Sequence, residues 1–181
     1  MRAFLVAVLA ALSSAAGLIL LRARRLKARH RAVFGAPLPD LEPAAERLVD
    51  APRALYHGTR FADGPAVLAV RWRAACVGDL WCTAGGIFLR REEGGEPLVI
   101  PLAWIEDASL LRAHAPIAGT DLPMLRLRWR RGGEALLTDF SLSGGMANLE
   151  KLRREIHLRQ GRDAVASALA PFLERAGELG K

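Results

Sequence analysis

The sequence contains few of the residues from which metal centres are built. It has only two cysteines and four histidines in 181 residues. Cys76 and Cys82 are separated by five residues of an apolar stretch that offers no third or fourth ligand, a pattern typical of buried free thiols in a reducing compartment. The histidines are scattered without metal-ligand spacing: His30, His57, His114 and His157. We therefore expect no metal and no other cofactor.

Motifs for catalysis are also lacking. None of the four Gly-Gly pairs is followed by Lys and Ser or Thr, as a phosphate-binding loop requires. Glu106 and Asp107 are adjacent, so in a strand their side chains point to opposite faces and cannot form a carboxylate dyad. We therefore expect a protein that is not an enzyme.

The basic charge is confined to one segment. The formal net charge is +7 with a pI near 10.6, which would ordinarily suggest a nucleic-acid partner. However, Arg2 and six cations between residues 22 and 31 account for seven of the 26 Lys and Arg, and the remaining 19 balance the 19 Asp and Glu. The chain after residue 31 is formally neutral, so we expect no nucleic-acid binding by the domain.

An apolar run at the N-terminus predicts a transmembrane anchor. Ala3 to Leu21 is uncharged, and its only polar side chains are Ser13 and Ser14. Its nineteen residues match the length that spans a bilayer as a helix. A cleaved signal peptide is the alternative, but the cationic cluster after the run favours an uncleaved anchor with the C-terminal domain in the cytoplasm. The sequence thus predicts a single-pass protein of the inner or plasma membrane, with its N-terminus outside.

The cationic cluster has two interpretations, as a topology signal and as a surface for anionic lipid head groups, at about 1 kcal/mol per cation. The candidate membrane-surface contacts are Arg22, Arg24, Arg25, Lys27, Arg29 and Arg31. Prolines then interrupt the chain as far as Pro52, which is typical of a semi-rigid linker. The predicted organisation is an anchor (1–21), a basic juxtamembrane segment and Pro-rich linker (22–52), a domain (53–160) and a helical tail (161–181).

The sequence of the domain predicts a series of short strands. The clearest element is a hairpin over Met124–Ser141, in which apolar residues alternate with arginines and Gly132-Gly133 forms the turn. This register places Arg126 opposite Asp139 and Arg131 opposite Glu134, and predicts two cross-strand ion pairs on one polar face. The earlier predicted strands are Ala54–Thr59, Val67–Ala75, Cys76–Thr83, Gly86–Arg91, Pro97–Pro101 and Trp104–Arg112.

A helix follows the strands. Ser143 can cap it, and its apolar residues recur every three or four positions: Met146, Leu149, Leu152 and Ile156. A second helix is predicted over Ala164–Leu173. The predicted fold class is mainly β with α, in which a PH-like barrel of about seven antiparallel strands follows the anchor and a C-terminal amphipathic helix caps it.

The stretch Leu55–Leu142 resembles small bacterial membrane proteins that have one N-terminal anchor and one cytoplasmic PH-like domain. The residues that carry this resemblance are Tyr56-His57-Gly58-Thr59, Phe61-Ala62-Asp63-Gly64-Pro65, Gly85-Gly86-Ile87-Phe88-Leu89, Ile100-Pro101-Leu102-Ala103-Trp104-Ile105, Leu127-Arg128-Trp129-Arg130-Arg131-Gly132-Gly133 and Leu137-Thr138-Asp139-Phe140. Some members of that largely uncharacterised family are labelled transporters or export proteins, but one helix cannot form a transport pathway alone. The resemblance implies a barrel that binds a ligand or partner.

Two binding functions follow. The first is a membrane-tethered adaptor or scaffold that binds a protein partner at an edge strand or at a groove beside the helix. The alternative is binding of anionic lipid or another small anionic ligand by a basic face. The candidate residues of that face are Arg71, Arg73, Arg126, Arg128, Arg130 and Arg131. The same arginines also fit a solvated sheet face with paired charges, which the neutral domain favours.

Overall fold

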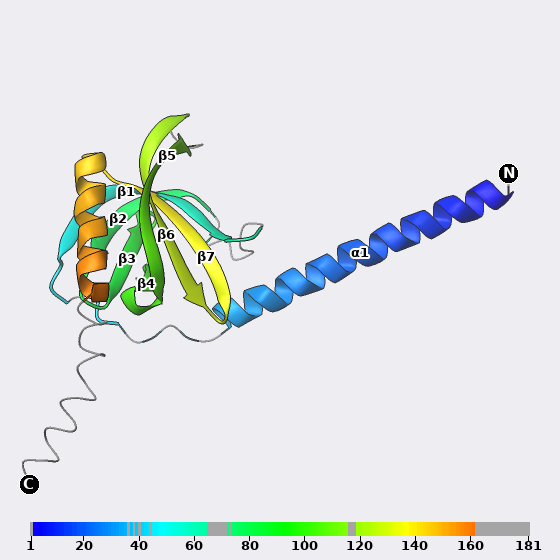
Figure 1. Cartoon of the computed structure of the whole chain (residues 1–181), viewed down its shortest axis with the longest axis horizontal. Coiled ribbons are helices and arrows are strands. Elements are labelled where there is room, and N and C mark those ends of the chain that lie inside the picture. Colours follow the sequence, from blue (N-terminus) through cyan, green and yellow to red (C-terminus); the bar gives the residue numbers. More distant parts are fainter. Residues whose placement is uncertain are drawn as a thin grey trace, which may run out of the picture.

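The computed structural model describes residues 2–35, 37, 39, 41–43, 45–64, 72, 74–115 and 119–161, with side chains from residue 16 onward. A long helix, α1 (Arg2–Phe34), extends away from a strongly curved β-sheet (Figure 1). A second helix, residues 146–161, lies along the other side of the sheet.

The sheet has seven antiparallel strands, as the sequence predicts, in the order β4-β3-β2-β1-β7-β6-β5. Their bounds are β1 Val49–Phe61, β2 Cys76–Cys82, β3 Gly86–Arg91, β4 Leu98–Pro101, β5 Ile105–Ala115, β6 Thr120–Arg131 and β7 Glu134–Ser141, and a short 3-10 helix, η1 (Leu102–Trp104), joins β4 to β5. β1 starts four residues before the predicted domain boundary. Two register shifts along β1 bend it, so that it pairs with β2 on one side and β7 on the other.

The helix of residues 146–161 closes the core as its apolar stripe predicts. Leu149, Leu152 and Ile156 are completely buried, and each stabilises the fold by about 1.5–3 kcal/mol relative to exposure. Met146 is 40% exposed and therefore lies outside the buried stripe. Ser143 does not cap this helix through its hydroxyl, which instead donates to the Pro52 carbonyl at 2.8 Å.

The predicted register of the β6–β7 hairpin is confirmed, including Arg126 opposite Asp139 and Arg131 opposite Glu134. Arg126 makes two hydrogen bonds of 2.8 Å to Asp139 on the outer face. The expectation that both predicted pairs share this face is wrong, because Arg131 lies on the same side of the strand as Trp129 and is buried. The Glu134 carboxylate accepts hydrogen bonds from Arg29 of α1.

The predicted transmembrane anchor is corrected. Within the described residues no helix is long and apolar enough to cross a membrane, so that expectation is wrong for this part of the chain. Among the described side chains of α1, cations occupy six of the ten positions that follow Leu21. Residues 3–15, which form the rest of the predicted anchor, lie outside the described side chains. So do most of the strand predicted at Val67–Ala75 and all of the helix at Ala164–Leu173.

The last turns of α1 pack onto the sheet at what we call the junction. Arg29 donates to Glu134 at 2.6 and 2.9 Å and to Asp63 at 2.8 Å, and its guanidinium lies 4.2 Å from the Phe61 ring centre. These hydrogen bonds raise the pKa of Arg29, so the guanidinium stays charged. One turn further on, Val33 is completely buried. The direction of α1 relative to the sheet is therefore set by polar and apolar contacts together.

A chain of hydroxyl groups crosses the core. Trp129 Nε1 donates to Thr138 Oγ1 at 2.9 Å, and the Thr138, Thr59 and Tyr56 oxygens follow at 2.7 Å intervals. The chain ends where the Tyr56 hydroxyl donates to the Trp72 carbonyl. An indole N–H only donates and a carbonyl only accepts, so every hydroxyl between them must donate in the same direction.

Candidate functional site

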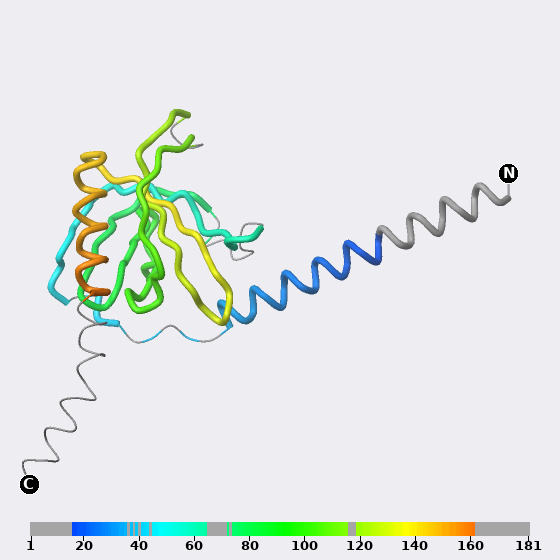
Figure 2. The backbone as a smooth tube through the Cα atoms, in the orientation of Figure 1, coloured from blue at the N-terminus to red at the C-terminus, as the bar shows by residue number. Residues whose placement is uncertain are grey.

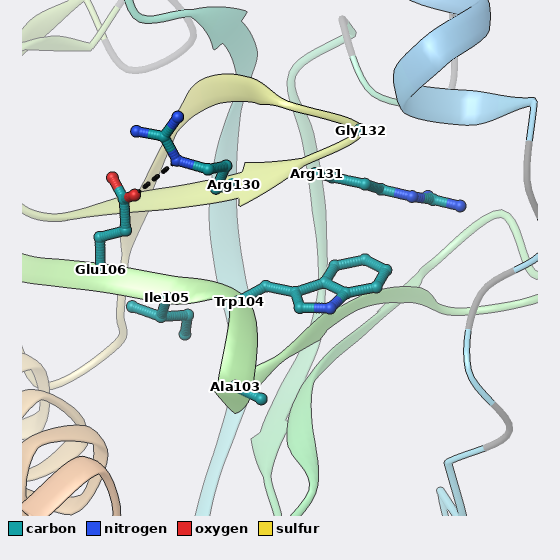
Figure 3. Close-up of a pocket in the computed structure, with 7 residues that line it drawn as sticks. All are labelled: Ala103, Trp104, Ile105, Glu106, Arg130, Arg131 and Gly132. Carbon is teal, nitrogen blue, oxygen red and sulfur yellow. Dashed lines mark hydrogen bonds and ion pairs between the residues drawn. The ribbon is translucent and has the colours of Figure 1, made fainter. Parts of the chain in front are cut away.

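A cavity of about 380 Å³ opens at one end of the sheet, and we call it the Trp104 pocket. It is formed where η1, the start of β5 and the β6–β7 turn meet (Figure 3). Pro101 precedes η1, and its fixed backbone angle ends β4 and starts the tight turn that brings Trp104 to the opening. The lining residues are Ala103, Trp104, Ile105, Glu106, Arg130, Arg131 and Gly132.

The aromatic wall of the pocket is the Trp104 ring, which packs on a tryptophan of the core. The half-buried Trp104 ring stacks on the completely buried Trp129 ring, with centres 6.3 Å apart and planes within 3° of parallel. The Arg131 guanidinium lies 5.1 Å from the Trp104 ring centre and 5.9 Å from that of Phe34 in α1. Burial lowers the pKa of Arg131, but an arginine remains charged. The pocket therefore presents a rigid indole beside a cation.

The opposite wall carries Glu106 and Arg130, and Arg128 lies just outside the pocket. The Glu106 carboxylate accepts from Arg130 at 2.7 Å and from Arg128 at 3.2 Å. The hydrogen bond from Arg130 is the main cause of the lowered pKa of Glu106, which stays ionised at neutral pH. One carboxylate thus serves two guanidinium groups. Figure 3 shows the Arg130–Glu106 contact at one end of the pocket, with Trp104 and Arg131 extending together at the other.

The side chains of the Trp104 pocket are suited to binding. None of the residues that line the Trp104 pocket carries a hydroxyl, thiol, amine or imidazole that could act as a nucleophile or general base toward a substrate. Its carboxylate is held by two arginines. An aromatic ring beside a cation instead suits an acidic or aromatic side chain of a partner, because it offers both apolar area and a charge-assisted hydrogen bond.

The structure separates the arginines that the sequence grouped as one face. Arg126 is bound to Asp139, while Arg128 and Arg130 share Glu106 on the outer face. Arg131 points to the other side and reaches Trp104. Arg71 and Arg73 lie outside the described residues. Of the described arginines, only Arg130 and Arg131 line the pocket, and they lie at its opposite ends.

The cations of α1 fall into two groups. Five of the six candidate membrane contacts are exposed, namely Arg22, Arg24, Arg25, Lys27 and Arg31. The sixth, Arg29, belongs to the junction. The sequence offered no signal for this difference, because Arg29 is one of six cations in ten residues and its partners lie 34 and 105 residues away.

Both cysteines are free thiols, as the sequence predicts, and at least one of them is buried. Cys82 is buried, and burial raises its pKa to about 12. Cys76 is half-buried, and desolvation is the main cause of its raised pKa. Within the described residues, no group of three or more His, Cys, Asp or Glu side chains is close enough to hold a metal ion.

Comparison with models of known protein families and with curated proteins finds no match. The function must therefore be inferred from the geometry of the pocket and of the surfaces around it.

Proposed function

We propose that this protein is a non-enzymatic adaptor that binds a protein partner at the Trp104 pocket. The observation that carries the proposal is the half-buried Trp104 ring, which is braced by Trp129 and adjoined by the Arg131 guanidinium. Tryptophan and arginine in a desolvated pocket are the residues that most often dominate the energy of protein interfaces. The resemblance to PH-like domains supports the same type of function.

The pocket is favoured over the neighbouring edge strand as the contact point. β5 forms one end of the sheet, and a partner strand could in principle extend it. However, two side chains of the helix at residues 146–161 already occupy its first carbonyls: Gln160 binds the Ile105 oxygen at 2.5 Å and His157 binds the Ala108 oxygen at 3.3 Å. Strand addition beside the pocket would have to displace both contacts.

A photo-crosslinking pull-down from whole cells tests the proposal. The crosslinking side chain replaces exposed Ala103 at the rim of the pocket, and exposed Arg112 of β5 serves as the matched control position. We expect a discrete protein to be captured from position 103 and not from position 112. Trp104→Ala in the same chain should abolish that product. Recovery of the same proteins from both positions, or a product unaffected by Trp104→Ala, would contradict the proposal.

A second function is supported by the exposed cations of α1. Arg22, Arg24, Arg25, Lys27 and Arg31 extend over about three helical turns, and each contributes about 1 kcal/mol of attraction to an anionic lipid surface. Flotation with vesicles of neutral lipid and of neutral lipid mixed with phosphatidylserine tests this attraction. Replacing the five cations by Gln should remove the gain from phosphatidylserine, whereas Lys151→Gln with Arg154→Gln on the other helix should leave it unchanged. Equal flotation with both vesicle types would contradict it.

A further inference from the structure

A second cavity, of about 320 Å³, lies at the opposite end of β7 from the Trp104 pocket, and we call it the Arg53 pocket. Leu55, Leu122, Pro123 and Leu142 form its apolar lining. Residues 120–124 of β6 pair with β5 but not with β7, because β7 ends at Ser141. The β5–β6 arm therefore projects beyond the rest of the sheet (Figure 2), and its Leu122 and Pro123 form one wall of the cavity.

The two serine hydroxyls that line the Arg53 pocket donate their hydrogens to other groups of the protein. Ser141 Oγ donates to the Pro123 carbonyl at 2.9 Å, so His57 Nε2, 3.0 Å away, must be the donor in its contact with Ser141. Ser143 Oγ donates to the Pro52 carbonyl at 2.8 Å. These hydroxyls have no hydrogen left for a ligand. No carboxylate lines the cavity among the residues described.

Arg53 is the one charged group that lines this cavity among the described residues, and its guanidinium makes no ion pair or hydrogen bond there. Its contact is through the backbone, where its N–H donates to Asp79 at 3.3 Å. Its φ of 55° makes it the only non-glycine residue with positive φ in the described chain. Such a backbone costs of order 1 kcal/mol or more and often occurs at binding sites.

We propose that the Arg53 pocket binds a small aliphatic carboxylate such as a medium-chain fatty acid. The aliphatic chain contacts Leu55, Leu122 and Leu142, and the carboxylate binds the Arg53 guanidinium at the rim. The charge complementarity favours an anion, since the cavity offers a cation and no acidic side chain. Its volume is at the lower limit of ligand pockets, which favours a short chain over a full-length lipid. The site is separate from the Trp104 pocket.

Titration of the full-length protein with decanoate, followed by calorimetry and by amide chemical shifts, tests this proposal. We expect saturable binding with shifts at Leu55 and Leu142, at least tenfold weaker binding of decanol, and no binding of decyltrimethylammonium. Arg53→Gly should weaken decanoate binding at least tenfold, while glycine accommodates the positive φ and keeps the fold. Arg53→Lys should retain most of the affinity. Arg154→Gln is the matched control and should leave the affinity unchanged.

Three results would overturn the proposal. The first is an absence of saturable decanoate binding at millimolar concentration. The second is equal affinity of wild-type protein and Arg53→Gly for decanoate, which would show that the cation takes no part. The third is shifts confined to the Trp104 pocket, which would place the anion site at Arg130 and Arg131. None of these results depends on the outcome of the crosslinking experiment at position 103, so the two proposals can fail separately.

Discussion

Replacing Thr138 by valine should destabilise the fold through the hydroxyl chain. Valine has nearly the shape of threonine, and Thr138 is completely buried, so the change removes a hydroxyl without opening a large cavity. Trp129 Nε1–H, which donates to Thr138 Oγ1 at 2.9 Å, is then left without an acceptor in the core. The Thr59 oxygen also loses the hydroxyl that donates to it at 2.7 Å.

The expected loss of stability is about 2–3 kcal/mol, because a buried donor without a partner costs about 1–3 kcal/mol and a second contact is lost with it. For a chain of this size that lowers the unfolding midpoint by roughly 4–12 °C. Thr138→Ser keeps the hydroxyl and loses one methyl group, so it should cost only about 1 kcal/mol. Thr120→Val on the exposed part of β6 is the control and should change stability by less than about 0.5 kcal/mol.

Urea unfolding followed by tryptophan fluorescence measures all three variants. The reasoning would be refuted if Thr138→Val were as stable as Thr138→Ser, since the order of costs depends on the hydroxyl and not on packing. The chain also predicts coupling. Tyr56→Phe and Thr138→Val should destabilise less together than the sum of their separate effects, because both interrupt the same series of hydrogen bonds.

Three further predictions concern the junction, His57 and the thiols. A double-mutant cycle of Arg29→Met and Glu134→Gln, measured by urea unfolding, should give a coupling free energy of roughly 1–2 kcal/mol. The exposed Arg47–Asp50 pair is the control and should give less than about 0.5 kcal/mol. Equal coupling energies for the two pairs would contradict the role of Arg29 at the junction. Burial lowers the pKa of His57, so the unfolded chain binds a proton at higher pH than the folded chain does, and stability should drop as pH falls below about 6.5. His57→Gln should remove that loss of stability. An equal loss in wild type and His57→Gln between pH 7 and 5 would show that His57 is not its source. Because the pKa of Cys82 is raised to about 12, a thiol reagent at pH 8 should label Cys82 only in denaturant, in a protein whose half-buried Cys76 is replaced by Ser, and rapid labelling of that native protein would count against the burial of Cys82.

The parts of the fold that depend on local pattern could be predicted from the sequence. The β6–β7 register followed from alternating side chains and a two-glycine turn, because a slip by one residue would have exposed Leu125 and Trp129. The stripe of Leu149, Leu152 and Ile156 predicted the buried helix face for the same reason. Each pattern repeats within a few residues, where chain geometry dictates which side chains are neighbours.

The features that depend on distant contacts could not be predicted. Arg29 binds Glu134 across 105 residues, and no property of the cationic cluster distinguishes it from its neighbours. The Trp104 pocket forms only when η1 meets the β6–β7 turn, so the sequence pattern places Arg131 with the outer arginines and does not indicate a role for Trp104. β1 begins inside the predicted linker, since the conformation of Arg53 lets the strand continue past Pro52.

The position of Arg131 between two aromatic rings links helix α1 to the Trp104 pocket. The guanidinium lies 5.9 Å from Phe34 of α1 and 5.1 Å from Trp104, and Gly132 beside it packs against the backbone of Ala32. A partner that draws Arg131 away from Phe34 removes the Arg131–Phe34 interaction. The contact between α1 and the sheet then loses the free energy of that interaction. By thermodynamic reciprocity, any force that pulls α1 from the sheet alters the affinity of the pocket by the same factor. The Arg131 guanidinium and the Gly132–Ala32 backbone contact therefore join the helix and the pocket at the same turn.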